Sequence, residues 1–484
     1  MKTAVLKNVL PLFLILLLIS PAIGEQKTNV ILVLVDDLGW MDLSCQGSDY
    51  YQTPSVDRLA TEGIRFTNGY AACAVCSPTR AAIQTGRYPA RIGVTDWIRS
   101  LFQRGGLGTP DANPTEYVGG KKQKLLCPPN PYWMEHDELT MAEVLRDSGY
   151  HTAYIGKWHL GDEAWYPPHQ GYEVNRGGCD YGQPPSYFDP FNQPKHPHEM
   201  LRQGIPGLPG RKPDQFLTHR EAEEAVELID RWHDAPFFIQ LSHYAVHTPI
   251  QAISEVAAKY RRDGKNDQNA KYAAMVESVD DAMHSILEAL DRHGIADRTL
   301  VIFTSDNGGL DNNGAPTENA PLRSGKGYAY EGGLRVPFLM RWPKVIPAGS
   351  VSDQPVCSID VFPTVLEATG TSAPDQHVID GTSLLTHAVS GGRAALNRDE
   401  LLWHFPHYRH APGPYSVLRQ GDFKLISFYE GPQELYNLKE DLSETTDLAE
   451  SDSARLKTMH DRLMLRLKEI GARLPKPNPD YTGP

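Results

Sequence analysis

The strongest constraint on the fold is a continuous apolar segment, NVILVLVDD, which runs from Asn29 to Asp37 and ends in two aspartates. An apolar run without alternation is typical of a strand that is buried on both faces, as in parallel sheets. Helical and strand-like segments then alternate along the chain, with further strand-like runs at 64–71, 150–159, 236–247 and 299–309. This alternation predicts a large mixed, mostly parallel sheet sandwiched by helices.

Capping and periodicity signals mark the helices between these strands. Thr140 and Glu143 form a capping-box pattern before a segment that ends at Gly149. Between Met275 and Leu290, apolar residues recur at helical spacing on one face. We expect helices over about 54–62, 141–148 and 217–232, and a fourth that ends near Gly294.

Two long stretches, 98–137 and 177–214, interrupt the alternation and are rich in loop-forming residues. We expect them to form lids or walls over a ligand-binding edge. From about Arg398 the pattern changes to a strand-turn-strand signal around Gly421 and a final helix that begins near Ser453. We therefore expect an α/β catalytic domain at 25–395 and a smaller C-terminal α+β subdomain with an antiparallel sheet at 396–484.

The first residues have the pattern of a signal peptide. Two lysines precede an apolar run over 9–19, and a small-x-small cleavage pattern follows at 22–24. We expect residues 1–24 to direct export, which makes the mature protein periplasmic or secreted. No later segment reaches the roughly 18 apolar residues of a membrane span. The formal net charge of -13 argues against a general nucleic-acid binder. Six cysteines in an exported chain leave room for one or two disulfide bonds.

Polar residues follow the ends of several expected strands. Ligands of parallel sheets bind beyond the carboxyl ends of the strands, so these residues should meet at one edge. Five segments converge there and bring Asp36, Asp37, Cys76, Lys157, His159, His247, Asp306 and Asn307. The two pairs at 36–37 and 306–307 offer hard oxygen donors, which suit Ca²⁺ or Mg²⁺ better than zinc. Turn capping is the alternative for either pair alone.

The segment C-S-P-T-R starts at Cys76 and is the most informative motif. Pro78 fits the first turn of a helix, which places Cys76 at a helix N-terminus, where an anion is favoured. Arg80, in the next turn, could bind an oxyanion with its forked donors. The alternatives are a buried structural cysteine or a redox dithiol with Cys73. A four-cysteine zinc site lacks a second C-x-x-C pair.

The motif resembles the C-x-P-x-R signature of the formylglycine-dependent sulfatases, which have the alkaline-phosphatase-like fold. The resemblance covers nearly the whole mature chain, because further family motifs occur in order: the early D-D pair, G-K-W-H-L-G at 156–161, H-T-P at 247–249, D-N-G-G at 306–309 and G-K-G at 325–327. In this family a maturase oxidises the cysteine to formylglycine, and the hydrated aldehyde is the nucleophile. The chain is therefore expected to be a sulfuric ester hydrolase, similar to N-acetylgalactosamine and aryl sulfatases.

The resemblance also implies roles for individual residues. Metal ligands carry over to Asp36, Asp37, Asp306 and Asn307, with the modified residue 76 also at the metal, one Ca²⁺ per chain rather than Mg²⁺. Arg80 and Lys157 would hold the charge of the sulfate group. His247, assisted by Lys326, would give a proton to the leaving alcohol, and His159 would take a proton as sulfate is released.

The substrate depends on loops outside the motifs. We expect exo-acting removal of sulfate from galactose or N-acetylgalactosamine units of a sulfated glycan, with His404 and His407 as substrate contacts. A phosphate or phosphonate monoester hydrolase of the same superfamily is one alternative. A non-catalytic glycan-binding homologue and a thiol-disulfide oxidoreductase are two others. Loss of function on changing Cys73 would favour the oxidoreductase.

Overall fold

The structure is a computed structural model that describes residues 27–104 and 109–483; the expected signal peptide lies outside these ranges. Its centre is an eight-stranded sheet in the order β10-β2-β9-β8-β1-β7-β5-β6. The strands are β1 (Asn29–Val35), β2 (Ile64–Phe66), β5 (His151–Gly156), β6 (Val174–Arg176), β7 (Phe237–Ser242), β8 (Thr299–Ser305), β9 (Phe338–Arg341) and β10 (Ser350–Ser352). Within this sheet only β9 runs antiparallel to its neighbours, β8 and β2. The expected mixed, mostly parallel sheet is confirmed.

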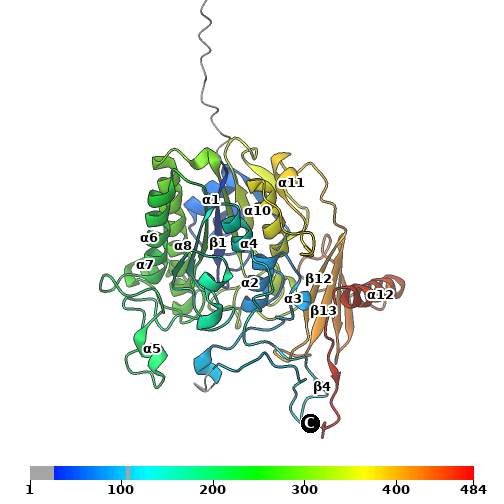
Figure 1. Ribbon diagram of the computed structural model, residues 1–484. Coiled ribbons are helices and arrows are strands. Elements are labelled where there is room, and N and C mark those ends of the chain that lie inside the picture. The colour runs from blue at the N-terminus through cyan, green and yellow to red at the C-terminus, as the bar shows by residue number, and fades with distance from the viewer. Residues whose placement is uncertain (1–26, 105–108, 484) are drawn as a thin grey trace, which may run out of the picture.

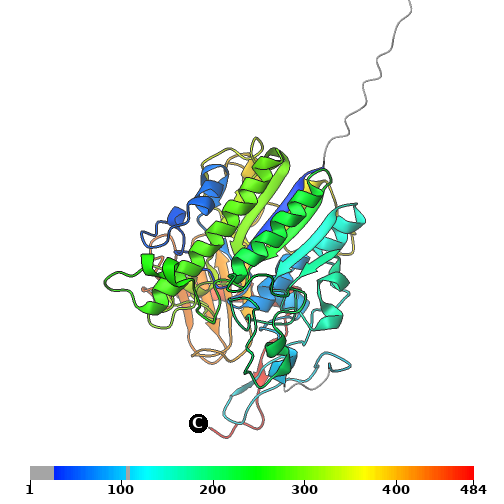
Figure 2. The same ribbon diagram turned by 90° about the vertical axis from the view of Figure 1, so that its left-hand side faces the viewer.

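The two faces of the sheet are covered by different helices because β1 alternates its side chains between two cores. Ile31 and Val33 face the core beneath α1 (Pro54–Thr61), α6 (Leu217–Trp232) and α8 (Asp267–Arg292). Val30 and Leu32 face the opposite core, beneath α2 (Cys76–Thr85), α4 (Met141–Asp147) and α10 (Val361–Thr369). Figures 1 and 2 show these helix layers on either side of the sheet. Burial on both faces explains why β1 is apolar throughout.

The helix predictions are confirmed within one or two residues at α1, α4, α6 and at the end of α8. Thr140 and Glu143 form the predicted capping box at the start of α4. The expected strand at 64–71 is instead divided between β2 and β3 (Gly69–Tyr70). β3 leaves the main sheet and pairs with β11 (Val356–Cys357) because the chain turns at Thr67 and Asn68. Shorter helices are α3 (Pro89–Ile92), α5 (Glu199–Gln203), α7 (Ser254–Lys259), α9 (Glu331–Leu334) and α11 (Leu385–Val389).

The C-terminal part forms a separate antiparallel sheet in the order β12-β13-β14-β15. Its strands are β12 (Glu400–Phe405), β13 (Tyr415–Gln420), β14 (Phe423–Phe428) and β15 (Gln433–Asn437), and α12 (Ser453–Glu469) packs on it (Figure 1). The last strand, β16 (Lys476–Pro477), pairs with β4 (Leu125–Leu126) of the first long loop. The expected antiparallel sheet and final helix are present, while the domain boundary at 395 stays a prediction.

The cysteines correct one expectation. All six are free thiols, and five of them are buried in separate parts of the structure. Cys73 exchanges hydrogen bonds with Thr79 through its backbone N–H and C=O, so the residue shapes the turn into α2. The one or two disulfide bonds expected from an exported chain are not formed. Across the described ranges, no helix combines the length and apolar character that crossing a membrane requires.

Candidate active site

The polar residues expected at one edge do meet there, at the carboxyl ends of four parallel strands. Asp36 and Asp37 follow β1, and Asp306 follows β8 directly. Lys157 follows β5, and its backbone N–H donates to the Ser242 carbonyl at the end of β7. Backbone pairing of neighbouring strands therefore fixes the relative heights of these side chains, as expected for a doubly covered sheet.

Cys76 lies opposite these strand ends as the first residue of α2. Val75 is the N-cap, and Pro78 occupies the first helical turn as predicted. The Ser77 hydroxyl donates to the His159 carbonyl and accepts from the Ile98 N–H, which ties the start of α2 to two other segments of the site. The helix N-terminus therefore directs its free N–H groups and residue 76 toward the strand ends.

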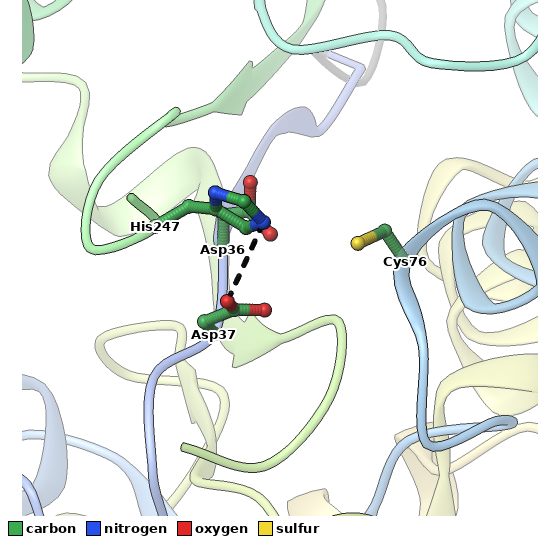
Figure 3. Close-up of side chains that lie close together, drawn as sticks. All are labelled: Asp36, Asp37, Cys76 and His247. Carbon is green, nitrogen blue, oxygen red and sulfur yellow. Dashed lines mark ion pairs between the residues drawn. The ribbon is translucent and has the colours of Figure 1, made fainter. Parts of the chain in front are cut away.

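Four side chains gather closely enough to share one metal ion. Ligand atoms of Asp36, Asp37, Cys76 and His247 all lie within 4.8 Å of one another. Figure 3 shows the Cys76 thiol facing the two aspartates and the imidazole across the site. Three of these four residues belong to the ligand set expected from the sequence, and His247 was expected in a different role.

Unsatisfied oxygen atoms identify the place where a cation fits. Asp36 Oδ1, Asp37 Oδ2 and Asn307 Oδ1 are buried and accept no hydrogen bond from any residue that the structure describes. A buried oxygen without a donor is costly, so such a group calls for a bound partner. Three hard oxygens converging from two strand ends suit Ca²⁺ or Mg²⁺, and the donor set fits the expected metal.

Asp306 is held in place by other residues of the site. Its Oδ2 accepts from Arg80 Nε at 2.8 Å, and its Oδ1 accepts from the Asp37 N–H at 3.2 Å. Asn307 donates from Nδ2 to Asp37 Oδ1 at 2.7 Å, which turns its own Oδ1 away from that contact. All five predicted metal-site residues are therefore brought together, although Asp306 is engaged with Arg80.

Each carboxylate of the site is matched by one buried cation. Lys157 Nζ lies 2.6 Å from Asp36 Oδ2, and Lys326 Nζ lies 2.6 Å from Asp37 Oδ1. Arg80 Nη2 lies 2.8 Å from Asp306 Oδ2. The side chains thus balance in charge, so a divalent cation would leave the cavity positive and attractive to an anion.

Burial and these charges set the pKa values of the acidic groups. Burial and the nearby Asp306 carboxylate raise the pKa of Asp36 well above its usual range. Burial opposes ionisation of Asp37 as well, yet Lys326 and His247 hold its pKa below its usual value. Burial also raises the pKa of the Cys76 thiol against the opposing effect of Lys157. The encoded thiol is therefore protonated and weakly nucleophilic at neutral pH.

The two histidines are held in defined tautomers. His247 Nδ1 donates to the Thr248 carbonyl at 3.0 Å, which leaves Nε2 facing Asp37 Oδ2 at 3.6 Å. Burial and the Lys326 charge lower the pKa of His247 to about 3. His159 Nε2 donates to the Ile98 carbonyl at 2.7 Å, and its buried Nδ1 has no partner among the described residues. Burial and the Lys157 charge lower the pKa of His159 well below its usual value, so its Nδ1 is a free acceptor.

A buried network supports the loop after β1, and no sequence pattern indicated it. The Asp42 carboxylate accepts from the Gly39 N–H, the Tyr272 hydroxyl and the Thr317 hydroxyl. The Tyr272 hydroxyl also lies 3.1 Å from the Asp37 carbonyl oxygen. Asp37 has a left-handed backbone with φ of 62°, a conformation that needs such support in a non-glycine residue.

A cavity of about 200 Å³ opens over Cys76, His159, His247 and Lys326. Both long loops line it, as predicted: the first contributes Phe102 and Gln103, and the second contributes Gly182 and Gln183. Further lining residues are Val75, Trp97 and Arg409. The loops were expected as walls, but the contributing side chains could not be chosen from the sequence, because nothing in a loop pattern says which residues face inward.

The expected substrate contacts His404 and His407 require correction. Both are buried, at 5% and 7% exposure, and neither lines the cavity. His404 is hydrogen-bonded to Ser416 and to the Arg473 carbonyl, and His407 is hydrogen-bonded to Thr95. The same stretch reaches the cavity through Arg409. Strand β12 turns His404 into the C-terminal sheet, which a histidine-rich pattern does not indicate.

Comparisons with known proteins agree with this geometry. The family model described as Sulfatase matches residues 28–371, and that described as N-sulphoglucosamine sulphohydrolase, C-terminal, matches residues 324–472. A "Sulfatase" of Formosa agariphila is 34% identical over 92% of this chain and 90% of its own length. Human N-acetylgalactosamine-6-sulfatase is 33% identical over 76% of this chain and 67% of its own length. The crystal structure of Ps i-CgsB in complex with k-i-k-neocarrahexaose superposes with a TM-score of 0.76 at 29% identity, and covers 91% of this chain and 93% of that one.

Proposed function

The chain belongs to the sulfatase family and is a sulfuric ester hydrolase, and on that premise we propose that it removes sulfate from a sugar unit of a sulfated glycan, with formylglycine made from Cys76. The observation that carries this proposal is the position of Cys76, which is the first residue of α2 and faces three buried oxygens that have no donor within the described ranges. The protonated thiol at this position is a poor nucleophile, which favours its role as a precursor.

The cofactor of this proposal is one Ca²⁺ ion. Asp36, Asp37, Asn307 and the modified residue 76 would hold it, with Asp306 beside them. When bound, the ion would supply a fixed positive charge that polarises its ligands and favours deprotonation at the nucleophile. Ca²⁺ accepts a larger and less regular oxygen shell than Mg²⁺, which suits ligands that come from separate strands.

The buried cations bind and orient the sulfate group. Arg80 and Lys157 reach the site from α2 and from the end of β5, and both are fixed by their carboxylate partners. Because these cations are already in position, they can stabilise charge on the sulfate oxygens without rearrangement. Lys326 Nζ lies 3.5 Å from Cys76 Sγ and extends this positive surface to residue 76.

The two histidines move protons in opposite directions. His247 is neutral before substrate arrives, and the anionic sulfate ester would raise its pKa, so that Nε2 can protonate the leaving oxygen beside Lys326. His159 keeps a free acceptor at Nδ1, because its Nε2 hydrogen is committed to the Ile98 carbonyl. This atom would take the proton that must leave residue 76 as sulfate is released.

The substrate proposal is exo-acting cleavage at galactose or N-acetylgalactosamine. The cavity volume is below the roughly 300 Å³ at which pockets for drug-sized ligands begin, so it suits one sugar unit better than a chain segment. Trp97 and Phe102 offer aromatic faces for a sugar ring. The similarity to N-acetylgalactosamine-6-sulfatases supports the choice of sugar. The similarity to a structure in complex with a neocarrahexaose supports a carbohydrate substrate.

Maturation and location complete the proposal. A formylglycine-generating maturase would modify Cys76 before the chain is exported by residues 1–24 to the periplasm or the medium. The catalytic domain would extend over 25–395 and the C-terminal subdomain over 396–484. No nucleic-acid partner is proposed, in keeping with the net charge of -13.

The test combines mass spectrometry with sulfate release. Protein co-expressed with a maturase should carry formylglycine at residue 76, and it should release sulfate from 6-sulfated N-acetylgalactosamine. Cys76→Ala should lose at least about 10⁴-fold in kcat/KM, because it lacks the nucleophile. Cys73→Ser is the matched control and should retain activity.

Three results would contradict the proposal. An unmodified thiol in protein made with the maturase would favour a glycan-binding role. Faster cleavage of an aryl phosphate than of the matching aryl sulfate would favour a phosphate or phosphonate monoester hydrolase. Loss of activity in Cys73→Ser with full activity in Cys76→Ala would favour dithiol chemistry.

A further inference from the structure

We propose that Arg409 recognises a second anionic group of the substrate, either a carboxylate or another sulfate, next to the ester that is cleaved. The inference rests on the proposed function, since it concerns the part of a sulfated glycan that surrounds the reacting group. Recognition of a second anion would narrow the substrates from any small sulfated sugar to those that carry two anionic groups.

Arg409 differs from the other cations of the site because it has no ion-pair partner in the described ranges. Arg80, Lys157 and Lys326 are each paired with an aspartate of the metal site at 2.6–2.8 Å. Arg409 also lines the cavity, but it makes no ion pair or hydrogen bond with the side chain of any residue in the described ranges. An exposed guanidinium that faces a cavity without a carboxylate partner retains all its donors for a ligand.

A glycine makes room for this side chain. A Cβ atom built on Gly327 would lie 2.3 Å from Arg409 Nε and 2.7 Å from its Cδ. Gly327 follows Lys326 directly and has φ of +88°, a backbone conformation that other residues rarely adopt. The glycine of the K-G pair thus lets the Arg409 guanidinium lie against the chain beside the catalytic lysine. Arg409 therefore packs against the backbone next to Lys326 and lines the same cavity as Cys76 and Lys326.

The groups around Arg409 are too few to neutralise it. Burial raises the pKa of Asp96 to about 6 against the opposing charge of Arg409, and Asp96 Oδ1 accepts the Trp97 N–H. The His410 ring also packs against Gly327 and stacks on Tyr328. Arg99 lies above the Trp97 ring, 5.1 Å from its centroid, but does not line the cavity. Trp97 and Arg409, which do line it, combine an aromatic face with positive charge, which suits an acidic sugar.

The chemistry of the ligand follows from the donor geometry. A guanidinium binds planar carboxylates and sulfate oxygens through two parallel N–H donors. The sulfate that is cleaved already has Arg80 and Lys157, so Arg409 serves a separate anion on the same sugar or on its neighbour. A uronic acid and a second sulfate ester are two sources of such an anion in sulfated glycans, and the test separates them.

The test compares Arg409→Gln with wild type on four substrates. They are a monosulfated N-acetylgalactosamine, a disulfated N-acetylgalactosamine, a sulfated sugar linked to a uronic acid, and an aryl sulfate. We expect kcat/KM to fall about 10- to 100-fold for at least one of the two substrates with a second anion, and to change less than about threefold for the others. Arg409→Lys should restore part of the loss, since it keeps the charge but not the fork.

A matched control and a binding measurement make the outcome decisive. Arg99→Gln removes the same charge at the rim from a residue that does not line the cavity, so it should leave the preference unchanged. Calorimetry with Cys76→Ala protein should show that the preferred dianionic sugar binds more tightly than the monosulfated sugar. Adding Arg409→Gln should raise the dissociation constant of the dianionic sugar about tenfold. Equal losses on all four substrates, or no loss on any, would overturn the inference. If wild type released sulfate from none of them, the proposed function would fail, and the calorimetry would still decide the role of Arg409.

Discussion

Two regions of this protein bury charged side chains in similar numbers, but the two groups of side chains have different roles. One is the cluster at the carboxyl ends of β1, β5 and β8, where aspartates meet Arg80, Lys157 and Lys326. The other, which we call the interface cluster, lies where the catalytic sheet meets the C-terminal sheet. It consists of Glu331, Lys424, Glu444, Arg335 and Arg419, all of them buried.

The interface cluster pairs its carboxylates with charges and N–H groups of its own, although Glu444 Oε1 meets Lys424 as an ion pair and accepts no hydrogen bond from the described residues. Lys424 Nζ lies 2.9 Å from Glu331 Oε1 and 2.8 Å from Glu444 Oε1. Arg335 Nε donates to Glu331 Oε2 at 2.6 Å, and the Glu331 N–H donates to Glu444 Oε2 at 2.7 Å. Every carboxylate oxygen of this cluster therefore has a cation or an N–H group of the protein within 2.9 Å.

Within the described part of the chain, the active-site cluster leaves three oxygens without donors, on Asp36, Asp37 and Asn307. The comparison shows that buried charge alone does not indicate a functional site, since an internally paired network can serve only to join two sheets. Several unsatisfied buried oxygens that converge on one place are the more specific sign, because they have a cost that one bound ligand can remove.

Replacing one buried lysine of each cluster with methionine should affect activity in one case and stability in the other. Lys157→Met should lower kcat/KM for sulfate release by about 10²- to 10³-fold in the presence of Ca²⁺, because it removes a fixed charge that stabilises the reacting sulfate. Lys424→Met should leave turnover per folded molecule within about threefold of wild type, because Lys424 has no contact with the reacting group.

Lys424→Met should instead destabilise the fold. It leaves Glu331 and Glu444 buried without their shared cation, so the free energy of unfolding should fall by about 3–5 kcal/mol. Denaturant unfolding of both variants measures this. If folded Lys424→Met lost turnover as Lys157→Met does, the interface cluster would have to be counted as part of the active site.

The metal site should make the stability of the protein depend on Ca²⁺. Ca²⁺ at 100 times its dissociation constant should stabilise the protein by about 2.7 kcal/mol, because only the folded state assembles the oxygen ligands. Asn307→Leu removes one unsatisfied oxygen without changing the charge, and it should weaken this effect. Thermal unfolding with Ca²⁺ and with a chelator measures it. Glu444→Gln is the control from the interface cluster, and an equal loss in that variant would contradict the assignment.

The smallest expected effect is a pH dependence from the interface cluster. Burial and the Glu331 charge, opposed by Lys424, raise the pKa of Glu444 from its ordinary 4.5 to about 7. Between these values the folded state binds more protons than the unfolded state, so this group's contribution to stability falls as the pH rises from about 5 to 7, by about 2 kcal/mol at most. Glu444→Gln stays neutral and should lose that dependence. Unfolding curves at pH 5, 6 and 7 for both proteins check this, and parallel curves would show that Glu444 does not titrate in this range.

Much of the fold could be predicted from the sequence because burial leaves a regular pattern. The apolar run of β1, the capping box of α4 and the helical periodicity of α8 each reflect local chemistry that tertiary contacts reinforce. The division of 64–71 into β2 and β3 was missed, since a continuous strand pattern does not show where a chain leaves one sheet for another.

In the candidate site too, residues placed by their neighbours in the sequence were predicted, and residues placed by contacts with distant segments were not. The motif around Cys76 predicted a helix start with Pro78 in its first turn, and strand ends predicted where Asp36 and Asp306 would lie. His404 and His407 were placed at the substrate because their residue types suit a sugar, but hydrogen bonds within the protein engage them both. Arg409, in the same stretch, reaches the cavity because Gly327 leaves space for it.

The sequence by itself therefore determined the alternation of strands and helices, the residues at the strand ends and the identity of the residue at the start of α2. These properties depend on neighbours within a few positions of the chain. Only the tertiary structure decided which oxygens remain without donors, which cations are already paired and which loop side chains face the cavity. Those properties arise from contacts between segments far apart in the chain, such as Lys326 with Asp37, and no local pattern specifies them.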